Sequence, residues 1–333
     1  MQTIDRRDFL KRTTTLAGIG LVAPTALVAR AQDNAQARAA KFTPTGGENP
    51  VEHLTGYIVD DHQAWFRRNN TALTSYRAHK TQKYPYFFPV AGPKTGLSLT
   101  SETGLPWPHH RSLFFGCDKV NGGNYWQTPV ANGQIVSQGI KLGKIDETSG
   151  ELSDHCLWSK PGQDPIIEDF RNFKLQLLPN GNYYIDCFFK VKMLTDITME
   201  KSNHGLFAVR CAQDICVNNG GTLLNSEGQS TEKNTFGKPA RWCTFFGKRA
   251  GIEPEVIEGI AMLLHKDVPH PAFKDCPWFT RDYGNYSPMP NNWFPEPLKL
   301  AKDETLELKY RVVAFAGTPK EADLDGLWDD FVA

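Results

Sequence analysis

Apolar and polar residues alternate with a period of two along much of the chain after residue 50. The clearest case is Leu306, Leu308, Tyr310 and Val312, which are separated by charged residues at 307, 309 and 311. Successive side chains of a strand point to opposite faces of the sheet. The alternation therefore predicts an antiparallel strand with one buried face and one solvated face.

A hairpin is predicted near the middle of the chain. The apolar segments 173–178 and 183–194 flank Pro-Asn-Gly-Asn at 179–182. Asn-Gly supplies the positive φ angles that a tight hairpin turn requires. The two segments are expected to pair as neighbouring strands.

Further short apolar runs are separated by clusters of Gly, Pro and Asn, at 112–115, 205–209, 241–246 and 257–264. Helical periodicity is confined to the C-terminus, where Leu324, Leu327, Trp328 and Phe331 recur at helical spacing. The sequence therefore predicts an all-β fold, a large antiparallel β-sandwich or supersandwich with a short C-terminal helix. No internal linker interrupts residues 51–333, so we expect a single domain.

The N-terminus has the pattern of an export signal. Arg6-Arg7 lies in a twin-arginine motif, followed by a weakly apolar stretch and by the small-x-small cleavage pattern at 29–31. We predict a twin-arginine signal peptide at 1–31 and a flexible leader at 32–50, which is rich in Ala, Asn and Gly without periodicity. The mature protein is expected to be periplasmic or secreted.

Charge and hydropathy exclude two classes of partner. The chain has 37 basic and 37 acidic residues, without the basic footprint that nucleic-acid binding needs. No segment after the signal has the roughly 18 apolar residues of a membrane span. Seven cysteines at irregular spacing are expected to be mostly buried, with a Cys211–Cys216 pairing left open.

The first candidate for chemistry is His109-His110-Arg111, between Pro106, Pro108 and an apolar run. In a regular strand His109 and Arg111 share one face and His110 takes the other, whereas a loop relaxes that limit. The histidines could be proton shuttles or oxyanion partners, with Arg111 binding the substrate. The alternative is a histidine pair hydrogen-bonded to the backbone in a structural role.

A second candidate is Glu227, in a Gly-bounded turn after an apolar strand, where a carboxylate could be a general acid or base. Asp282 is the alternative carboxylate, beside Arg281 and Tyr283, which could hold a hydroxylated substrate. The alternative for Glu227 is an ordinary solvated turn residue.

A third candidate is a loop with His265, Asp267 and His270. A loop could fold these residues around a divalent metal, because imidazole and carboxylate suit zinc, iron or manganese. No cofactor is otherwise required. The chain contains no Gly-x-Ser-x-Gly nucleophile motif, phosphate-cradling loop or dinucleotide fingerprint.

Several motifs in one order resemble those of the PmoA-like family, which are often exported bacterial proteins labelled "methane oxygenase PmoA". They are PYFFPVAGP (85–93), PHHRSLFFG (108–116), VNG (120–122), Trp126, GTLLNSEG (221–228), FGKPARW (236–242), His265, HP (270–271) and RDYG (281–284). The match runs from about residue 71 to 315. The chain departs from the family's pattern at Trp107, Cys117 and His204.

The resemblance implies a galactose-mutarotase-like supersandwich and a carbohydrate ligand. In mutarotase-like sites histidines and a carboxylate act on the anomeric oxygen of a sugar, and His109, His110, Glu227 and His265 are the implied counterparts. Asn121 and Trp126 lie in the shared motifs and are expected to contact the ligand, together with Arg111, His265, Arg281 and Tyr283.

The leading hypothesis is an exported carbohydrate-active enzyme that cleaves or rearranges a glycoside by acid/base chemistry, as a hydrolase, a lyase or an epimerase. Its predicted catalytic residues are His109, His110, Glu227 and Asp282. Two alternatives remain open: a sugar-binding sandwich without catalysis, and a metal-dependent oxygenase as the family label suggests.

Overall fold

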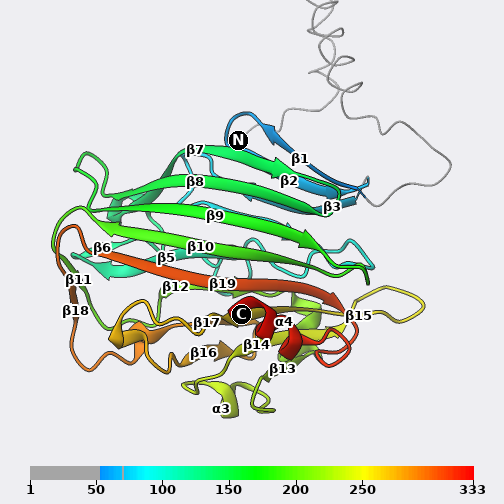
Figure 1. Ribbon diagram of the computed structural model, residues 1–333. Helices are drawn as coiled ribbons and strands as arrows, with labels where there is room; N and C mark the ends of the chain where they lie inside the picture. Colours follow the sequence, from blue (N-terminus) through cyan, green and yellow to red (C-terminus); the bar gives the residue numbers. More distant parts are fainter. Residues whose placement is uncertain (1–52, 70) are drawn as a thin grey trace, which may run out of the picture. The chain divides into compact units, whose positions relative to one another are not determined.

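A computed structural model of the protein describes residues 53–69 and 71–333. Within these residues two antiparallel sheets, of 11 and 8 strands, lie face to face (Figure 1). The predicted β-sandwich is therefore confirmed. The predicted signal peptide, 1–31, and leader, 32–50, fall outside the described residues.

The 11-stranded sheet combines strands from the first half of the chain with strands from its later part. Its main path runs through β1 (Leu54–Val59), β2 (Gln63–Arg68), β3 (Thr71–Arg77), β4 (Tyr86–Val90), β5 (Leu113–Val120), β12 (Gly205–Arg210), β17 (Asn285–Pro288) and β16 (Trp278–Arg281). Three short strands extend it: β6 (Gly123–Asn124) and β11 (Ile197–Met199) pair with β5, and β18 (Leu298–Leu300) pairs with β11. Segments distant in sequence thus meet at β5 and β12.

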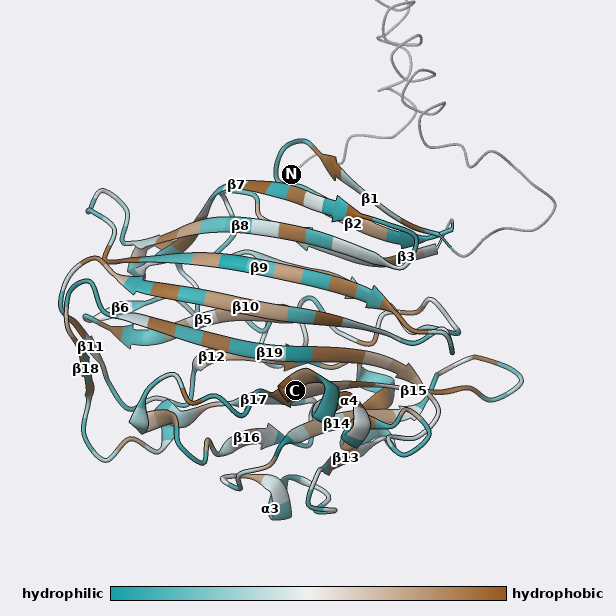
Figure 2. Cartoon of the chain, viewed as in Figure 1, coloured by the Kyte–Doolittle hydropathy of each residue, from teal (hydrophilic) through white to brown (hydrophobic). Residues whose placement is uncertain are grey.

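The 8-stranded sheet contains the long strands. Its order is β13 (Thr222–Asn225), β14 (Trp242–Lys248), β15 (Ile257–Leu264), β19 (Thr305–Ala316), β10 (Tyr183–Met193), β9 (Ile167–Leu177), β8 (Ser149–Ser159) and β7 (Gln134–Ile145). Apolar and polar residues alternate along β9, β10 and β19 (Figure 2). Most of their inward side chains are apolar, as the period of two predicts, but Asp169 and Arg171 of β9 also point inward. On the opposite face, Asp186 and Arg311 are buried.

The predicted hairpin is present as β9 and β10. Of the Asn-Gly pair only Gly181 has a positive φ, of +86°. Asn180 contributes differently, because its side-chain oxygen accepts a hydrogen bond from Asn182 N–H at 3.1 Å. The connection is therefore longer than the two-residue turn that Asn-Gly favours, and Leu178 N–H bonds to Asn182 O across it.

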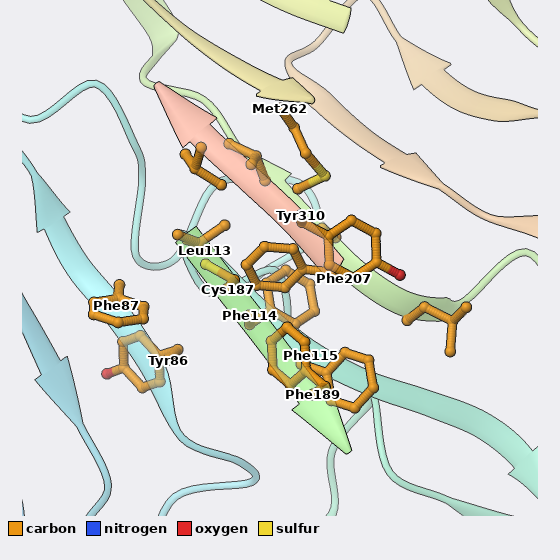
Figure 3. Close-up of a cluster of buried hydrophobic side chains, with 14 of the residues drawn as sticks. Tyr86, Phe87, Leu113, Phe114, Phe115, Cys187, Phe189, Phe207, Met262 and Tyr310 are labelled. Carbon is orange, nitrogen blue, oxygen red and sulfur yellow. The ribbon is translucent and has the colours of Figure 1, made fainter. Parts of the chain in front are cut away.

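The core lies between the two sheets and is rich in aromatic rings (Figure 3). Phe115 of β5 stacks on Phe189 of β10 with ring centroids 4.3 Å apart, and Phe207 of β12 contacts Tyr310 of β19 at 5.1 Å. All seven cysteines are buried and unpaired, so Cys211 and Cys216 do not form a disulfide in this structure. The expectation that the cysteines pack as small buried residues is confirmed.

The remaining elements are short. They are α3 (Glu232–Thr235), α4 (Leu324–Val332) and the 3₁₀ turns η1 (Val130–Asn132), η2 (Gln213–Ile215), η3 (Val217–Asn219), η4 (Pro271–Phe273) and η5 (Pro290–Asn292). The predicted C-terminal helix is α4, which packs Leu324 and Phe331 against β14, β15 and β19 (Figure 1). No helix among the described residues is long and apolar enough to cross a membrane.

Candidate functional site

The outer face of the 11-stranded sheet, away from the core, carries a group of aromatic and basic side chains. Because Phe115 of β5 points toward the other sheet, its neighbour Phe114 lies on the opposite face, where it is buried against Tyr84 and Trp126. The same alternation on β12 turns Phe207 inward and Arg210 outward. Around them lie six residues that we call the outer-face site: His109, His110, Trp126, His204, Arg210 and Tyr283.

The rings of the outer-face site are in mutual contact. The His109 ring lies 4.5 Å from that of His110 and 5.7 Å from that of His204, between centroids. His110 lies 6.4 Å from both Trp126 and Tyr283. The two adjacent histidines therefore lie together and not on opposite faces, because they precede β5 and belong to a loop.

The loop from residue 101 to 112 is held at both ends by the backbone of Arg210. Ser101 N–H donates to Arg210 O at 2.9 Å, and Arg210 N–H donates to Ser112 O at 2.7 Å. Ser112 has a φ of +57°, which turns the chain into β5. Within the loop Tyr84 donates its hydroxyl hydrogen to His109 O at 2.5 Å. These bonds fix the histidines beside β12.

Burial keeps the first two histidines neutral. It lowers the pKa of His109 to about 4, with His204 and Arg210 adding to the effect. It lowers the pKa of His110, which is 3% exposed, to about 2, with His109 and Arg210 as the next causes. A neutral imidazole has one donor and one acceptor nitrogen, so near neutral pH both rings can bind hydroxyl groups in either sense.

Several buried polar atoms of the outer-face site have no hydrogen-bond partner. They are His109 Nε2, His110 Nδ1, Trp126 Nε1 and two guanidinium nitrogens of Arg210, Nε and Nη1. Buried polar groups in native proteins are nearly always paired, and unpaired groups need an explanation such as a catalytic role or a missing ligand. The site therefore presents donors and acceptors that the described part of the protein does not use.

His204 is the member of the site with a carboxylate behind it. Its Nδ1 lies 3.4 Å from Oδ2 of the buried Asp118, and its Nε2 lies 3.3 Å from the side-chain nitrogen of Gln127. Asp118 N–H also donates to His204 O at 3.2 Å, which ties the two backbones together. A carboxylate on one ring nitrogen orients the imidazole and fixes its tautomer, as a catalytic base requires.

Glu227 lies in a different place from the histidines. It is in the exposed turn after β13 and lines a cavity of about 700 Å³, which we call the end cavity. His265 and Asp267 line the same cavity, with Lys309 and Trp328. None of the six residues of the outer-face site lines it. The fold therefore does not bring together His109, His110 and Glu227, which were predicted to share one site.

Asp282 and Arg281 are engaged with α3. Arg281 Nη1 lies 2.7 Å from Glu232 Oε1, and its guanidinium carbon lies 4.4 Å from the centroids of Phe236 and Phe279. Asp282 accepts the Glu232 N–H at 2.8 Å. Of the predicted Arg-Asp-Tyr group, only Tyr283 contacts the outer-face histidines.

Two other predicted ligand contacts have structural partners. Arg111 lies beside the Tyr86 ring, at 5.9 Å from its centroid. The Asn121 amide donates to Asp196 O at 2.9 Å and accepts from Thr198 N–H at 2.7 Å. Trp126 is the predicted contact that the structure does place in the site.

The predicted metal ligands do not converge. Asp267 binds Lys309 at 2.6 Å and lies 3.4 Å from His265 Nδ1, while His270 Nδ1 accepts the Ala272 N–H. Across the described part of the chain, no group of three or more His, Cys, Asp or Glu side chains is arranged to hold a metal ion. His265, Asp267 and His270 thus lack the geometry that a metal centre needs.

Sequence reasoning did not assign Asp118, His204 or Arg210 to the site. Arg210 ends an apolar run, GLFAVR, that indicates only a buried strand. An arginine closing such a run was an available signal, since a charge is rarely buried without purpose. Asp118 and His204 have no local signal, because pairing of β5 with β12 is what brings them together.

Comparisons with known proteins identify the family. A solved structure described as "Putative kojibiose phosphorylase from human microbiome" is similar, at 10% sequence identity and a TM-score of 0.29. The match covers 81% of this chain and 34% of that one, so the chain spans about a third of that protein's length. No curated protein matches the sequence. Residues 64–329 match the "Family of unknown function (DUF6807)", and the chain therefore belongs to this family.

Proposed function

We propose that the protein is an exported enzyme that rearranges a carbohydrate by acid/base chemistry at the outer-face site. The observation that carries this proposal is the set of unpaired polar atoms on His109, His110, Trp126 and Arg210, held among aromatic rings. A sugar offers matching hydroxyl groups around an apolar ring face. The implied likeness to mutarotase-like sites agrees with this chemistry.

His204 is the group suited to move a proton. With Asp118 on its Nδ1, its Nε2 can accept the proton of a sugar hydroxyl once the ligand displaces the Gln127 amide that lies 3.3 Å from it, and the carboxylate stabilises the imidazolium that forms. His109 and His110 are poorer bases, because burial lowers their pKa values to about 4 and about 2. They are better suited to orient hydroxyl groups as neutral hydrogen-bonding partners.

The chemistry can be written for a reducing sugar. A base takes the proton of the anomeric hydroxyl, whose oxygen becomes the carbonyl oxygen. At the same time the bond between the ring oxygen and the anomeric carbon breaks and an acid protonates the ring oxygen, which gives the open-chain aldehyde. The ring then closes on the other face of the aldehyde carbon, and both proton transfers are reversed to give the other anomer. Arg210 is placed to stabilise negative charge that develops on an oxygen of the ligand.

Hydrolysis of a glycoside is less well supported by the geometry. It needs two carboxyl groups on either side of the bond, about 5 to 9.5 Å apart. Glu227 lines the end cavity and Asp282 binds the backbone of α3. Asp118 is the carboxylate that contacts the outer-face site, through His204. One carboxylate behind a histidine favours proton transfer at hydroxyl groups.

The experiment is NMR measurement of anomer or epimer interconversion for a panel of reducing sugars, with glycosides included as controls for cleavage. We expect interconversion of at least one sugar, and the H204N variant should lower its rate by about 100-fold, a usual contribution of acid/base catalysis. H155Q is the matched control, because His155 lies on β8, stacked on Phe170. Binding without any turnover would instead identify a sugar-binding protein.

A further inference from the structure

Arg210 differs from the other buried arginines of the described residues. Four arginines are buried: Arg171, Arg210, Arg249 and Arg311. Arg171 binds Asp169, Arg249 binds Asp214, and Arg311 binds Asp186. No carboxylate of the described residues lies within ion-pair distance of Arg210, which is 0% exposed.

The surroundings of Arg210 leave most of its donors unused. Its Nη2 donates to Leu105 O at 2.8 Å, and its guanidinium carbon lies 4.6 Å from the centroid of the Tyr283 ring. Nε and Nη1 have no partner. Burial lowers the pKa of Arg210, and the thiols of Cys216 and Cys211 nearby are neutral because burial raises their own pKa values.

A buried cation without a counter-charge is unfavourable, and proteins usually keep one only where it is compensated or used. His109 and His110 do not compensate it, because they are neutral and can never be negative. Asp118, the carboxylate nearest to the site, is engaged with His204. No described residue therefore supplies the missing charge, and the site is suited to an anionic ligand.

The loop above Arg210 is built as a removable cover. Gly104 packs directly on the guanidinium, since a Cβ there would come within 2.4 Å of Arg210 Nε. The next residues face solvent, with Leu105 78% and Trp107 45% exposed. Lifting residues 103–108 would uncover the guanidinium while little apolar surface is lost from the interior.

We infer that Arg210 binds the carboxylate of an acidic sugar, such as a uronic acid, beneath the 103–108 loop. This inference rests on the proposed function and names its substrate class. One guanidinium balances one carboxylate, whereas a phosphate dianion would need a second cation that the neutral histidines do not supply. The planar guanidinium also matches a carboxylate with two parallel hydrogen bonds.

The test compares matched pairs of ligands by calorimetry: glucuronate against glucose, and galacturonate against galactose. The wild-type protein should bind at least one acid about tenfold or more tightly than its neutral counterpart, the size expected for charge-assisted hydrogen bonds. R210Q should lose this preference, so that it binds the acid and its neutral counterpart with equal affinity. Equal affinity for acid and neutral sugar, or a preference that R210Q retains, would overturn the inference.

The outcomes separate the inference from the proposed function. Turnover of neutral sugars without any preference for acids would leave the proposed function standing and refute the role of Arg210. Binding of acids through Arg210 without interconversion would support the role of Arg210 and refute the proposed function. If no sugar binds, neutral or acidic, both are wrong.

A second measurement needs no ligand. Replacing an unpaired buried cation by methionine should not lower the melting temperature, so R210M should be at least as stable as the wild type. R171M is the matched control, because it leaves the buried Asp169 without its ion-pair partner. Its melting temperature should be about 5 °C or more below that of the wild type. A comparable loss in R210M would show that Arg210 is structural and would refute the inference.

Discussion

His204 Nδ1 lies 3.4 Å from Asp118 Oδ2, and the backbone N–H of Asp118 bonds to the carbonyl oxygen of His204. The two residues come from separate parts of the sequence and meet where β5 pairs with the start of β12. The pair places a carboxylate behind the one histidine of the outer-face site that has such a partner. Its consequence for catalysis can be tested with a nearly isosteric change.

D118N should lower the rate of sugar interconversion by about 100-fold, since the amide neither stabilises the imidazolium nor fixes the tautomer of His204. The melting temperature should change little, because one oxygen of Asp118 already has no partner. Steady-state kinetics across pH, with circular dichroism for folding, measure both effects. D164N, in an exposed loop, is the control. An unchanged rate in D118N would remove the pair from the mechanism.

The buried histidines predict a dependence of stability on pH. Burial lowers the folded-state pKa of His109 to about 4 and of His110 to about 2, from 6.5 in the ordinary state. Between pH 6.5 and pH 4 the unfolded chain therefore binds more protons than the folded chain, so stability falls as the pH falls through this window.

Thermal melts at steps from pH 7 downward measure this dependence. The H109Q/H110Q variant should show a smaller fall in melting temperature than the wild type over the window, because glutamine does not titrate. H270Q, which replaces a histidine outside the site, should follow the wild type. Parallel curves for the wild type and the double variant would contradict the assignment of neutral buried histidines.

The position of Glu227 predicts that it is dispensable for chemistry at the outer-face site. E227Q should keep the wild-type rate of sugar interconversion, because Glu227 lines the end cavity with His265 and Asp267. H110Q should lose about tenfold or more through removal of an orienting hydrogen bond. Rates of the two variants, measured on the same sugar, decide between the sites. Loss of activity in E227Q alone would move the active site to the end cavity.

The fold was predictable because its strands carry local signals. The alternation at 306–312, the Asn-Gly turn and the helical spacing near the C-terminus each correspond to an element of the structure: β19, the β9–β10 hairpin and α4. Each signal reports a local backbone preference or which face of one element is buried. Neither depends on the partners of that element.

The site was predictable only in part, for the same reason. His109, His110, Trp126 and Tyr283 lie in motifs rich in aromatic and basic residues, and the structure brings these four together. Glu227 also lies in a motif typical of a site, but it follows β13 and lines the end cavity, apart from these four residues. Which motifs meet depends on the order of strands in the sheet, which no local pattern encodes.

Gly104 predicts how the cover over Arg210 can be disturbed. In G104A the added Cβ would lie 2.4 Å from Nε and 2.9 Å from Nη2 of Arg210, so either the loop or the guanidinium must move. Because the guanidinium also lies against the Tyr283 ring, which is outside the loop, we expect the loop to lift with loss of the bond to Leu105 O and to expose the guanidinium. Modification of Arg210 by phenylglyoxal, followed by mass spectrometry, should then be faster than in the wild type. T103A, a change at the exposed neighbouring position, should leave the modification slow. If Arg210 is as protected in G104A as in the wild type, Gly104 is not what lets the loop close over the guanidinium.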